Sequence, residues 1–191
     1  MKITFNAPVI LGFTFIACIV QALSDTLMPG LNHNYFAVTG HFNWSNIGDY
    51  FRLVSHIAGH ANWEHLIGNF AFILLIGPIL EERYGWKKLL MMILMTALAT
   101  GIINNVLWDT GIIGASGIVF MMILLGSLVN FRSGTIPLTF ILIVALYLGR
   151  EVYNALATDD NISQFGHIMG GVLGSVFGFI LGTGNKSSTT G

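Results

Sequence analysis

Six long apolar stretches constrain the fold of this chain more than any other feature of its sequence. A helix that crosses a bilayer needs about 20 mostly apolar residues. The stretches cover residues 7–28, 63–80, 88–107, 114–130, 135–153 and 163–182. Only 9% of the residues are charged, whereas soluble domains carry about 25%. We therefore predict an all-α, polytopic membrane protein with six transmembrane helices.

Length, net charge and cysteine content limit the domain organisation and the partners. The 191 residues fit one domain, which we place at residues 1–182, with a polar tail at residues 183–191. A net charge of −1 gives no footprint for nucleic-acid binding. Cys18 is the only cysteine, which excludes an intrachain disulfide and a zinc site built on cysteines. No cleavage signal follows the first apolar stretch, so we expect it to be retained as a span.

Lysine and arginine residues predict the orientation of the spans. With a cytoplasmic N-terminus, six of them lie inside and two lie outside. The six are Lys2, Arg83, Lys87, Lys88, Arg132 and Lys186, and the two are Arg52 and Arg150. We therefore expect both termini to be cytoplasmic and the protein to reside in the inner (cell) membrane.

The segment between the first two spans, residues 29–62, is a long external loop in this orientation. It is rich in histidine and aromatic residues, among them His33, His41, His56, His60 and Trp44. Loops of this length within compact domains are usually functional or lie on the membrane surface. We expect one of these two roles here.

Four polar side chains lie inside the spans, close to the outer membrane surface. They are His65 and Asn69 in the second span, Ser116 in the fourth and His167 in the sixth. Each of these spans begins at the outer side, and each side chain lies near its beginning. The sequence thus predicts that three helices bring them to one depth.

Ser116 and His167 have the chemistry of a nucleophile and its base. A serine hydroxyl is a weak nucleophile until a base removes its proton, and His167 is the only histidine after residue 65. Gly114 and Gly117 flank the serine, and free N–H groups at a helix start could stabilise an oxyanion. The alternative is that these small residues only form a helix-packing face. Gly170, one turn after His167, would let the sixth helix press against the fourth.

His65 and Asn69 are four residues apart and share a helix face. Their natural role beside a serine nucleophile is to donate hydrogen bonds to an oxyanion. A metal site of His56, His60 and His65 is the competing interpretation. The helical zinc motif H-E-x-x-H is absent and the spacing does not place these histidines on one helix face, so we expect neither a metal nor another cofactor.

Together these motifs resemble the rhomboid family of intramembrane serine proteases. HANWEHLIGN (60–69) is similar to the family's H-x4-H-x3-N, GASG (114–117) to G-x-S-G, and GHIMGGVLG (166–174) to its H-x-x-G-x-x-x-G helix. FR (51–52) resembles the W-R pair of the first loop and EERYG (81–85) the E-x-R motif after the second span. The resemblance covers about residues 51 to 182.

The resemblance implies a six-helix rhomboid bundle that cleaves the transmembrane segment of another membrane protein near the outer face, beside a small residue. Ser116 would be the nucleophile and His167 the general base. His65, Asn69 and the backbone N–H of Ser116 would form the oxyanion hole. His60 would be a structural hydrogen-bonding residue, and the fifth span, with Pro137, would border the substrate entrance.

Three positions depart from the family pattern. Phe51 replaces a tryptophan, Phe120 replaces a frequent tyrosine, and Gly166 replaces a common alanine. Phe120 lies one turn after Ser116 and could still stack on an imidazole ring. Gly166 is expected to loosen one packing contact. None of the three removes a reacting group.

Three other functions compete with proteolysis. They are a non-catalytic rhomboid-like protein that binds membrane helices, a small channel or transporter, and a metal-dependent membrane hydrolase. A channel would require polar residues along the whole length of the spans, and little lies between the outer cluster and Glu81 and Glu82 at the inner end. The sequence carries no signal for a particular oligomeric state.

Overall fold

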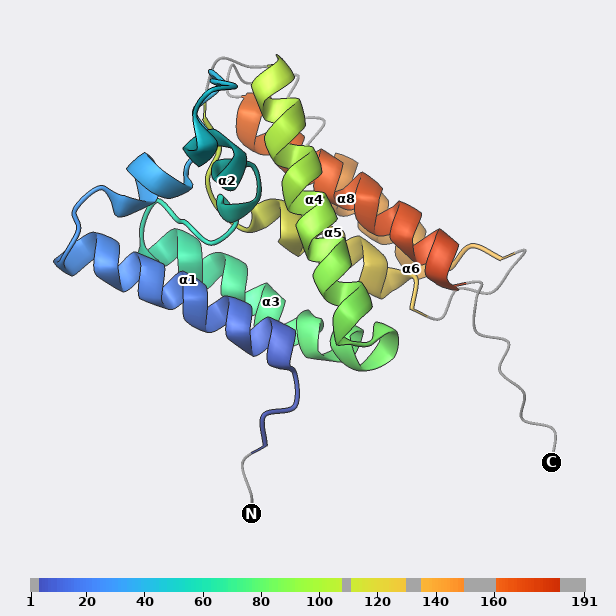
Figure 1. Ribbon diagram of the computed structural model, residues 1–191. Coiled ribbons are helices and arrows are strands. Elements are labelled where there is room, and N and C mark those ends of the chain that lie inside the picture. Colours follow the sequence, from blue (N-terminus) through green and yellow to red (C-terminus); the bar gives the residue numbers. More distant parts are fainter. Residues whose placement is uncertain (1–3, 108–110, 130–134, 150–160, 183–191) are drawn as a thin grey trace.

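Helices pack side by side along most of the described chain (Figure 1). The computed structural model describes residues 4–107, 111–129, 135–149 and 161–182. Its elements are α1 (Pro8–Thr26), the π-helical turn η1 (Asn32–Phe36), α2 (Ile47–Ser55), α3 (Trp63–Tyr84), α4 (Trp86–Leu107), α5 (Ser116–Ser127), α6 (Leu138–Ile143), the π-helical turn η2 (Val144–Leu148) and α8 (Asn161–Gly182). These residues contain no β-strand, and the predicted all-α class is confirmed.

The lengths of the helices agree with a membrane protein. By length and apolar composition, α1, α3 and α4 are each able to cross a membrane. Helix α5 and the apolar part of α8, Phe165–Leu181, are shorter. The predicted stretch 114–130 is helical only over the 12 residues of α5, about 18 Å at 1.5 Å per residue. The fourth span is thus shorter than predicted, and Ser116 begins it.

Two other predicted stretches also differ from the helices observed. The predicted stretch 63–80 corresponds to α3, which continues to Tyr84. The helix is followed by Gly85, whose φ of 80° favours glycine. The stretch 135–153 corresponds to α6 and η2 as far as residue 149, and its last four residues lie outside the described chain. The predicted tail at 183–191 also lies outside it.

Helix α5 is the central helix of the bundle. It contacts α3, α4, α6 and α8, and Figure 1 shows it between them. Its buried residues are Ile118, Val119, Met121, Met122, Ile123, Leu124 and Leu125. A helix that is apolar on all sides is typical of a buried position. The residue at its start, Ser116, is therefore surrounded by protein on several sides.

The backbones of α5 and α8 touch through glycines. A Cβ atom at Gly170 would lie 2.0 Å from the carbonyl oxygen of Gly117, and one at Gly174 would lie 2.2 Å from that of Met121. Real Cβ atoms do not approach backbone oxygens this closely, so only glycine fits at either position. Small residues permit the same close approach between helices in membranes. The expected pressing of the sixth span on the fourth through Gly170 is present.

One end of the bundle gathers the start of α1 and the ends of α3 and α5. The buried carboxylate of Glu81 accepts hydrogen bonds from the backbone N–H groups of Val9 (3.0 Å) and Ile10 (3.1 Å). It thereby satisfies donors that the first turn of a helix leaves free. Arg83 donates to the carbonyl of Val129, just after α5 (3.3 Å). The starts of α3, α5 and α8 lie at the opposite end.

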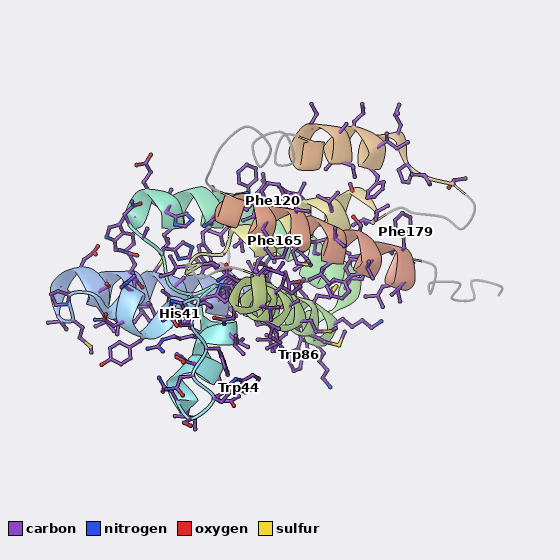
Figure 2. The ribbon with its side chains drawn as sticks, turned by 90° about the horizontal axis from the view of Figure 1, so that it is seen from above. His41, Trp44, Trp86, Phe120, Phe165 and Phe179 are labelled. Atoms are coloured by element: carbon purple, nitrogen blue, oxygen red, sulfur yellow. The ribbon has the colours of Figure 1, made fainter. Side chains whose placement is uncertain are left out.

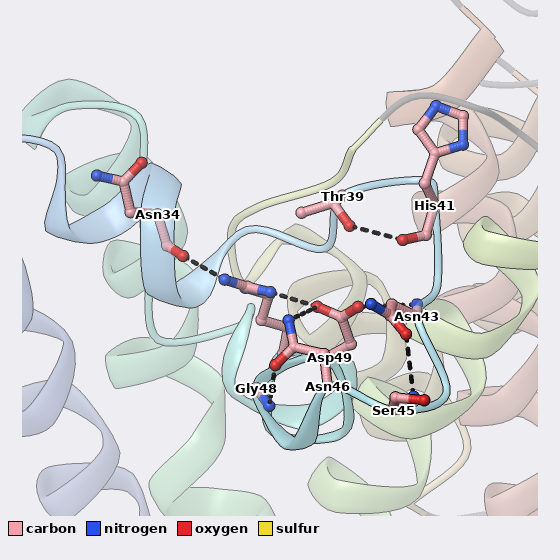
Figure 3. Close-up of polar contacts among 9 residues, drawn as sticks. Asn34, Thr39, His41, Asn43, Ser45, Asn46, Gly48 and Asp49 are labelled. Carbon is pink, nitrogen blue, oxygen red and sulfur yellow. Dashed lines mark hydrogen bonds and ion pairs between the residues drawn. The ribbon is translucent and has the colours of Figure 1, made fainter.

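The loop between α1 and α3 has internal structure that the sequence did not predict in detail. Asn46 caps α2 by accepting a hydrogen bond from the N–H of Gly48 (3.0 Å). Asp49 forms an ion pair with Arg52, whose guanidinium also donates to the carbonyl of Asn34 (Figure 3). These contacts tie α2 to η1 and give the loop a defined shape.

Candidate active site

Ser116 is the first residue of α5. The preceding residue, Ala115, is the N-cap, and Gly114 has a φ of 119°, which favours glycine. The first N–H groups of a helix have no partner within the helix. The hydroxyl of Ser116 therefore lies next to backbone donors and to the positive end of the α5 dipole.

Backbone and side-chain groups of the first loop hold the segment that leads to Ser116. Val38 donates its N–H to the carbonyl of Ile112 (3.0 Å), and Gly114 donates to the carbonyl of His56 (2.9 Å). Ala115 donates to Nε2 of His60 (3.3 Å). The loop thus fixes the backbone immediately before the serine.

Gly114 lies directly against the imidazole of His65. A Cβ atom at this glycine would be 2.6 Å from Cε1 and 2.9 Å from Nε2 of that ring. Together with its positive φ, this contact makes glycine the only residue that fits at position 114. The conformation of the serine loop and the position of His65 are coupled here.

His65 and Asn69 lie on successive turns of α3, at its start. The side chain of Asn62 caps the helix by accepting a hydrogen bond from the N–H of His65 (2.8 Å). Asn69 is 8% exposed, and its Nδ2 atom has no hydrogen-bond partner among the described residues. A buried amide donor without a partner is costly, and such a donor suits a group that arrives with substrate.

The imidazole of His167 stacks on the ring of Phe120. The two ring centroids are 4.5 Å apart and the planes differ by 4°. Figure 2 marks Phe120 where α5 and α8 meet. The stacked contact fixes the plane of an imidazole that lies one turn from the point where Gly170 meets Gly117.

Ser116 and His65 line a common cavity of about 230 Å³. His56, Thr100, Gly117 and Gly166 contribute to the same wall. His167 directly follows Gly166, and Asn69 lies one turn along α3 from His65. The structure thus brings together the starts of α3, α5 and α8, although neither His167 nor Asn69 is among the residues that line this cavity.

The family model of the rhomboid domain matches residues 47–184 of this chain. The chain belongs to the rhomboid family. It is 25% identical over 134 residues to the rhomboid protease GlpG of Haemophilus influenzae, and the match covers 68% of each chain. It is 28% identical over 172 residues to RHOMBOID-like protein 2 of Arabidopsis thaliana, and 26% identical over 146 residues to the chloroplastic rhomboid-like protein 11. The matches cover 84% and 74% of this chain but only 52% and 51% of these two plant relatives.

All the motif residues of the site fall within the matched rhomboid domain, whereas α1 and η1 precede it. From the sequence, His56 is a candidate only as a metal ligand, and Thr100 is not a candidate at all. The structure places both in the cavity wall. A threonine in an apolar stretch gives no sequence signal that separates a cavity residue from an ordinary membrane residue.

The histidines of the first loop have separate partners in this rhomboid bundle. Nε2 of His56 lies 3.1 Å from the carbonyl oxygen of Ala97, and Nε2 of His60 accepts from Ala115. Burial lowers the pKa of the His56 ring to about 4, and burial together with the neighbouring His65 lowers the pKa of the His60 ring to about 4. Both rings are therefore neutral at pH 7. Among the described residues, no group of three His, Cys, Asp or Glu side chains could hold a metal ion.

The expectation that glycine at position 166 loosens a packing contact is wrong. A Cβ atom there would meet no atom within 4 Å, so this glycine does not give up a contact that alanine would make. The backbone at Gly166 does approach α5, since its carbonyl oxygen lies 3.2 Å from the Cβ position of Gly117. An alanine methyl group at position 166 would nevertheless find open space.

Proposed function

We propose that this rhomboid protein is an intramembrane serine endopeptidase in which Ser116 is the nucleophile and His167 the general base. One observation carries the proposal. Ser116 begins a buried helix beside a cavity shared with His65, and the helix that contacts it there holds the stacked imidazole of His167. The similarity to a protein named rhomboid protease supports the same function.

In the first step, Oγ of Ser116 attacks the carbonyl carbon of the scissile peptide while the imidazole of His167 takes the hydroxyl proton. The tetrahedral intermediate then collapses, the C–N bond breaks, and His167 returns the proton to the leaving amine. A water molecule attacks the resulting ester with His167 again as base. The second intermediate collapses, the bond between the acyl carbon and Oγ breaks, and His167 returns the proton to Oγ, which releases the acid product and restores the serine.

The negatively charged oxygen of the intermediate needs hydrogen-bond donors, and the site offers several. The backbone N–H of Ser116, the imidazole of His65 and the amide of Asn69 are the candidates for the oxyanion hole. The burial of Asn69 and its unpartnered Nδ2 atom support this role. Removing one such donor typically lowers the rate by about 10²–10³.

We propose a dyad, without a carboxylate that orients the base. Serine hydrolases in water commonly use a buried Asp for that purpose. Here Asp49 pairs with Arg52, and Glu81 caps α1 at the other end of the bundle. Asp159 and Asp160, the acids nearest to His167 in sequence, lie outside the described residues. Stacking on Phe120 supports an imidazole held by packing.

The proposed substrate is the transmembrane segment of another membrane protein, cleaved near the outer face beside a small residue. Membership of the rhomboid family and the similarity to a protein named rhomboid protease support a substrate of this class. We further propose that the protein lies in the inner membrane with both termini in the cytoplasm. A reporter fused to the C-terminus, active only in the cytoplasm, tests this orientation.

The deciding experiment uses the purified protein, reconstituted with a generic single-span substrate. Ser116→Ala and His167→Ala should each abolish cleavage, and the double variant should be no slower, because the two residues act as a unit. A fluorophosphonate probe should label wild type and leave Ser116→Ala unlabelled. Substantial turnover by folded Ser116→Ala would show that another group is the nucleophile.

The same assay separates the competing functions. His65→Ala and Asn69→Ala should each slow cleavage strongly while the protein stays folded, and a chelator should have no effect. Loss of activity with a chelator and its return with zinc would instead favour a metal-dependent hydrolase. Capture of the substrate helix without cleavage or labelling would favour a non-catalytic binding protein.

A further inference from the structure

A buried cluster of amide side chains joins α1 to the start of α3, outside the matched rhomboid domain. Gln21 of α1 is 2% exposed and Asn32 of η1 is 7% exposed. Buried amides are costly unless their polar atoms form hydrogen bonds. Neither residue belongs to a motif identified in the sequence, and the mechanism above uses neither.

The hydrogen bonds of this cluster form a chain in which Asn32 donates to Gln21 and Gln21 donates to Asp25. Nδ2 of Asn32 donates to Oε1 of Gln21 (2.8 Å) and to the backbone carbonyl of His60 (2.7 Å). Nε2 of Gln21 donates in turn to Oδ1 of Asp25 (3.1 Å). Both hydrogens of the Asn32 amide are therefore used, and one of them fixes the backbone at His60.

His60 carries this connection to the nucleophile. Its side chain is completely buried, and its Nε2 atom accepts the hydrogen bond from Ala115, the residue before Ser116. The ring also packs edge-on against His65, with centroids 5.1 Å apart. A displacement of the His60 backbone would therefore move the serine loop and an oxyanion donor together.

We propose that Gln21 and Asn32 are positioning residues of the active site. They hold the backbone of His60, and the His60 ring holds Ala115, so that Ser116 starts α5 at the correct place. This inference rests on the proposed function of Ser116. It assigns a role in the reaction to α1 and η1, which lie outside the matched rhomboid domain. Misplacing a reacting group by about 1 Å can lower a rate by about 10².

The test uses Asn32→Leu, which keeps the volume but removes both donated hydrogen bonds, and Gln21→Met, which leaves the bond from Asn32 to His60 intact. Thr14→Val is the matched control in the same helix, because the Thr14 hydroxyl bonds only to the backbone of α1, at Ile10 (2.8 Å). Each full-length variant is assayed for kcat and KM on a single-span substrate, for labelling of Ser116 by a small fluorophosphonate, and for thermal unfolding.

We expect Asn32→Leu to lower kcat and the labelling rate by about tenfold or more, with KM within about twofold of wild type. Gln21→Met should lower both rates less, by about threefold, and the double variant should match Asn32→Leu because the two residues act in series. Thr14→Val should label at the wild-type rate. Faster hydrogen exchange of the Ala115 amide in Asn32→Leu would report the displaced loop independently of activity.

Wild-type labelling and kcat in folded Asn32→Leu would overturn the inference and assign the cluster to the stability of α1 alone. If Asn32→Leu does not fold, Gln21→Met becomes the deciding variant. A wild-type rate of labelling together with wild-type hydrogen exchange of the Ala115 amide in Gln21→Met would also overturn the inference. A wild-type protein that neither cleaves nor labels would instead contradict the proposed function itself.

Discussion

Two regions hold the candidate site in place, and they use different interactions. The contact between α5 and α8 consists of backbone against backbone, with Gly170 and Gly174 facing carbonyl oxygens. The first loop instead holds residues 112–115 through three hydrogen bonds: Val38 donates to Ile112, while His56 and His60 accept from Gly114 and Ala115. The helix contact has no space for one added carbon atom, whereas each loop bond contributes about 1 kcal/mol.

The two regions should respond differently to substitutions. Interiors are close-packed and transmit strain, so an added atom in the helix contact must separate the helices along their length. Hydrogen bonds of the loop are lost one at a time, and each loss shifts the serine loop by a limited amount. We therefore expect all-or-none effects from the helix contact and graded effects from the loop.

The largest effect is expected for Gly170→Ala. Its methyl group would lie 2.0 Å from the carbonyl oxygen of Gly117, and overpacking a close contact typically costs about 1–3 kcal/mol and sometimes more. We expect loss of cleavage and a strongly lowered unfolding temperature in detergent. The matched control is Gly166→Ala, one turn earlier, where the Cβ position is open. It should retain stability or gain up to about 1 kcal/mol in helix propensity. Equal stability of the two variants would contradict the comparison.

The next effect concerns pH. Lowering the pH should weaken the first loop, which holds buried histidines, and should leave the contact between α5 and α8 unchanged. His56 and His60 have folded-state pKa values of about 4, below the value of about 6.5 for an unfolded histidine. Below pH 6.5 the unfolded chain therefore binds more protons. The free energy of unfolding should be greatest above pH 6.5 and fall toward pH 4, by up to about 1.4 kcal/mol per pH unit for each histidine.

Unfolding midpoints measured across this pH range check the prediction. His60→Gln should reduce the slope, since one of the two buried histidines of the loop is gone. His33→Gln is the control, because that side chain is exposed. A slope that stays unchanged in His60→Gln would contradict the assignment of the pH dependence to the loop.

The smallest effect is expected for Phe120→Leu, which removes the stacked ring but keeps an apolar side chain of similar size. Aromatic pairs contribute about 0.5–1.5 kcal/mol beyond the area they bury, and 1.36 kcal/mol corresponds to a tenfold change in rate. We expect kcat to fall by about two- to tenfold with KM unchanged. Phe179→Leu, also at an aromatic contact of α8 but distant from His167 along the helix, should leave kcat unchanged. A similar loss in both variants would mean that stacking does not orient the imidazole.

The sequence predicted much of the fold because apolar length is a property of the chain alone. The stretches 7–28, 88–107 and 163–182 correspond to α1, α4 and α8 within two residues at each end. The short fourth span could not be recognised in the same way. Its helix begins at Ser116 because hydrogen bonds with Val38, His56 and His60 hold residues 112–115 outside the helix, and these partners lie more than 50 residues earlier in the sequence.

The sequence by itself indicated the candidate reactive groups of this protein. Ser116, His167, His65 and Asn69 are polar side chains within apolar stretches, and their predicted placement near one membrane surface follows from the order of the spans. Only the tertiary structure decided what holds them. Gln21 and Asn32 look like ordinary polar residues until burial removes water and their amide N–H groups need acceptors within the protein. Their hydrogen bonds join segments that are distant in sequence, so no local pattern encodes them.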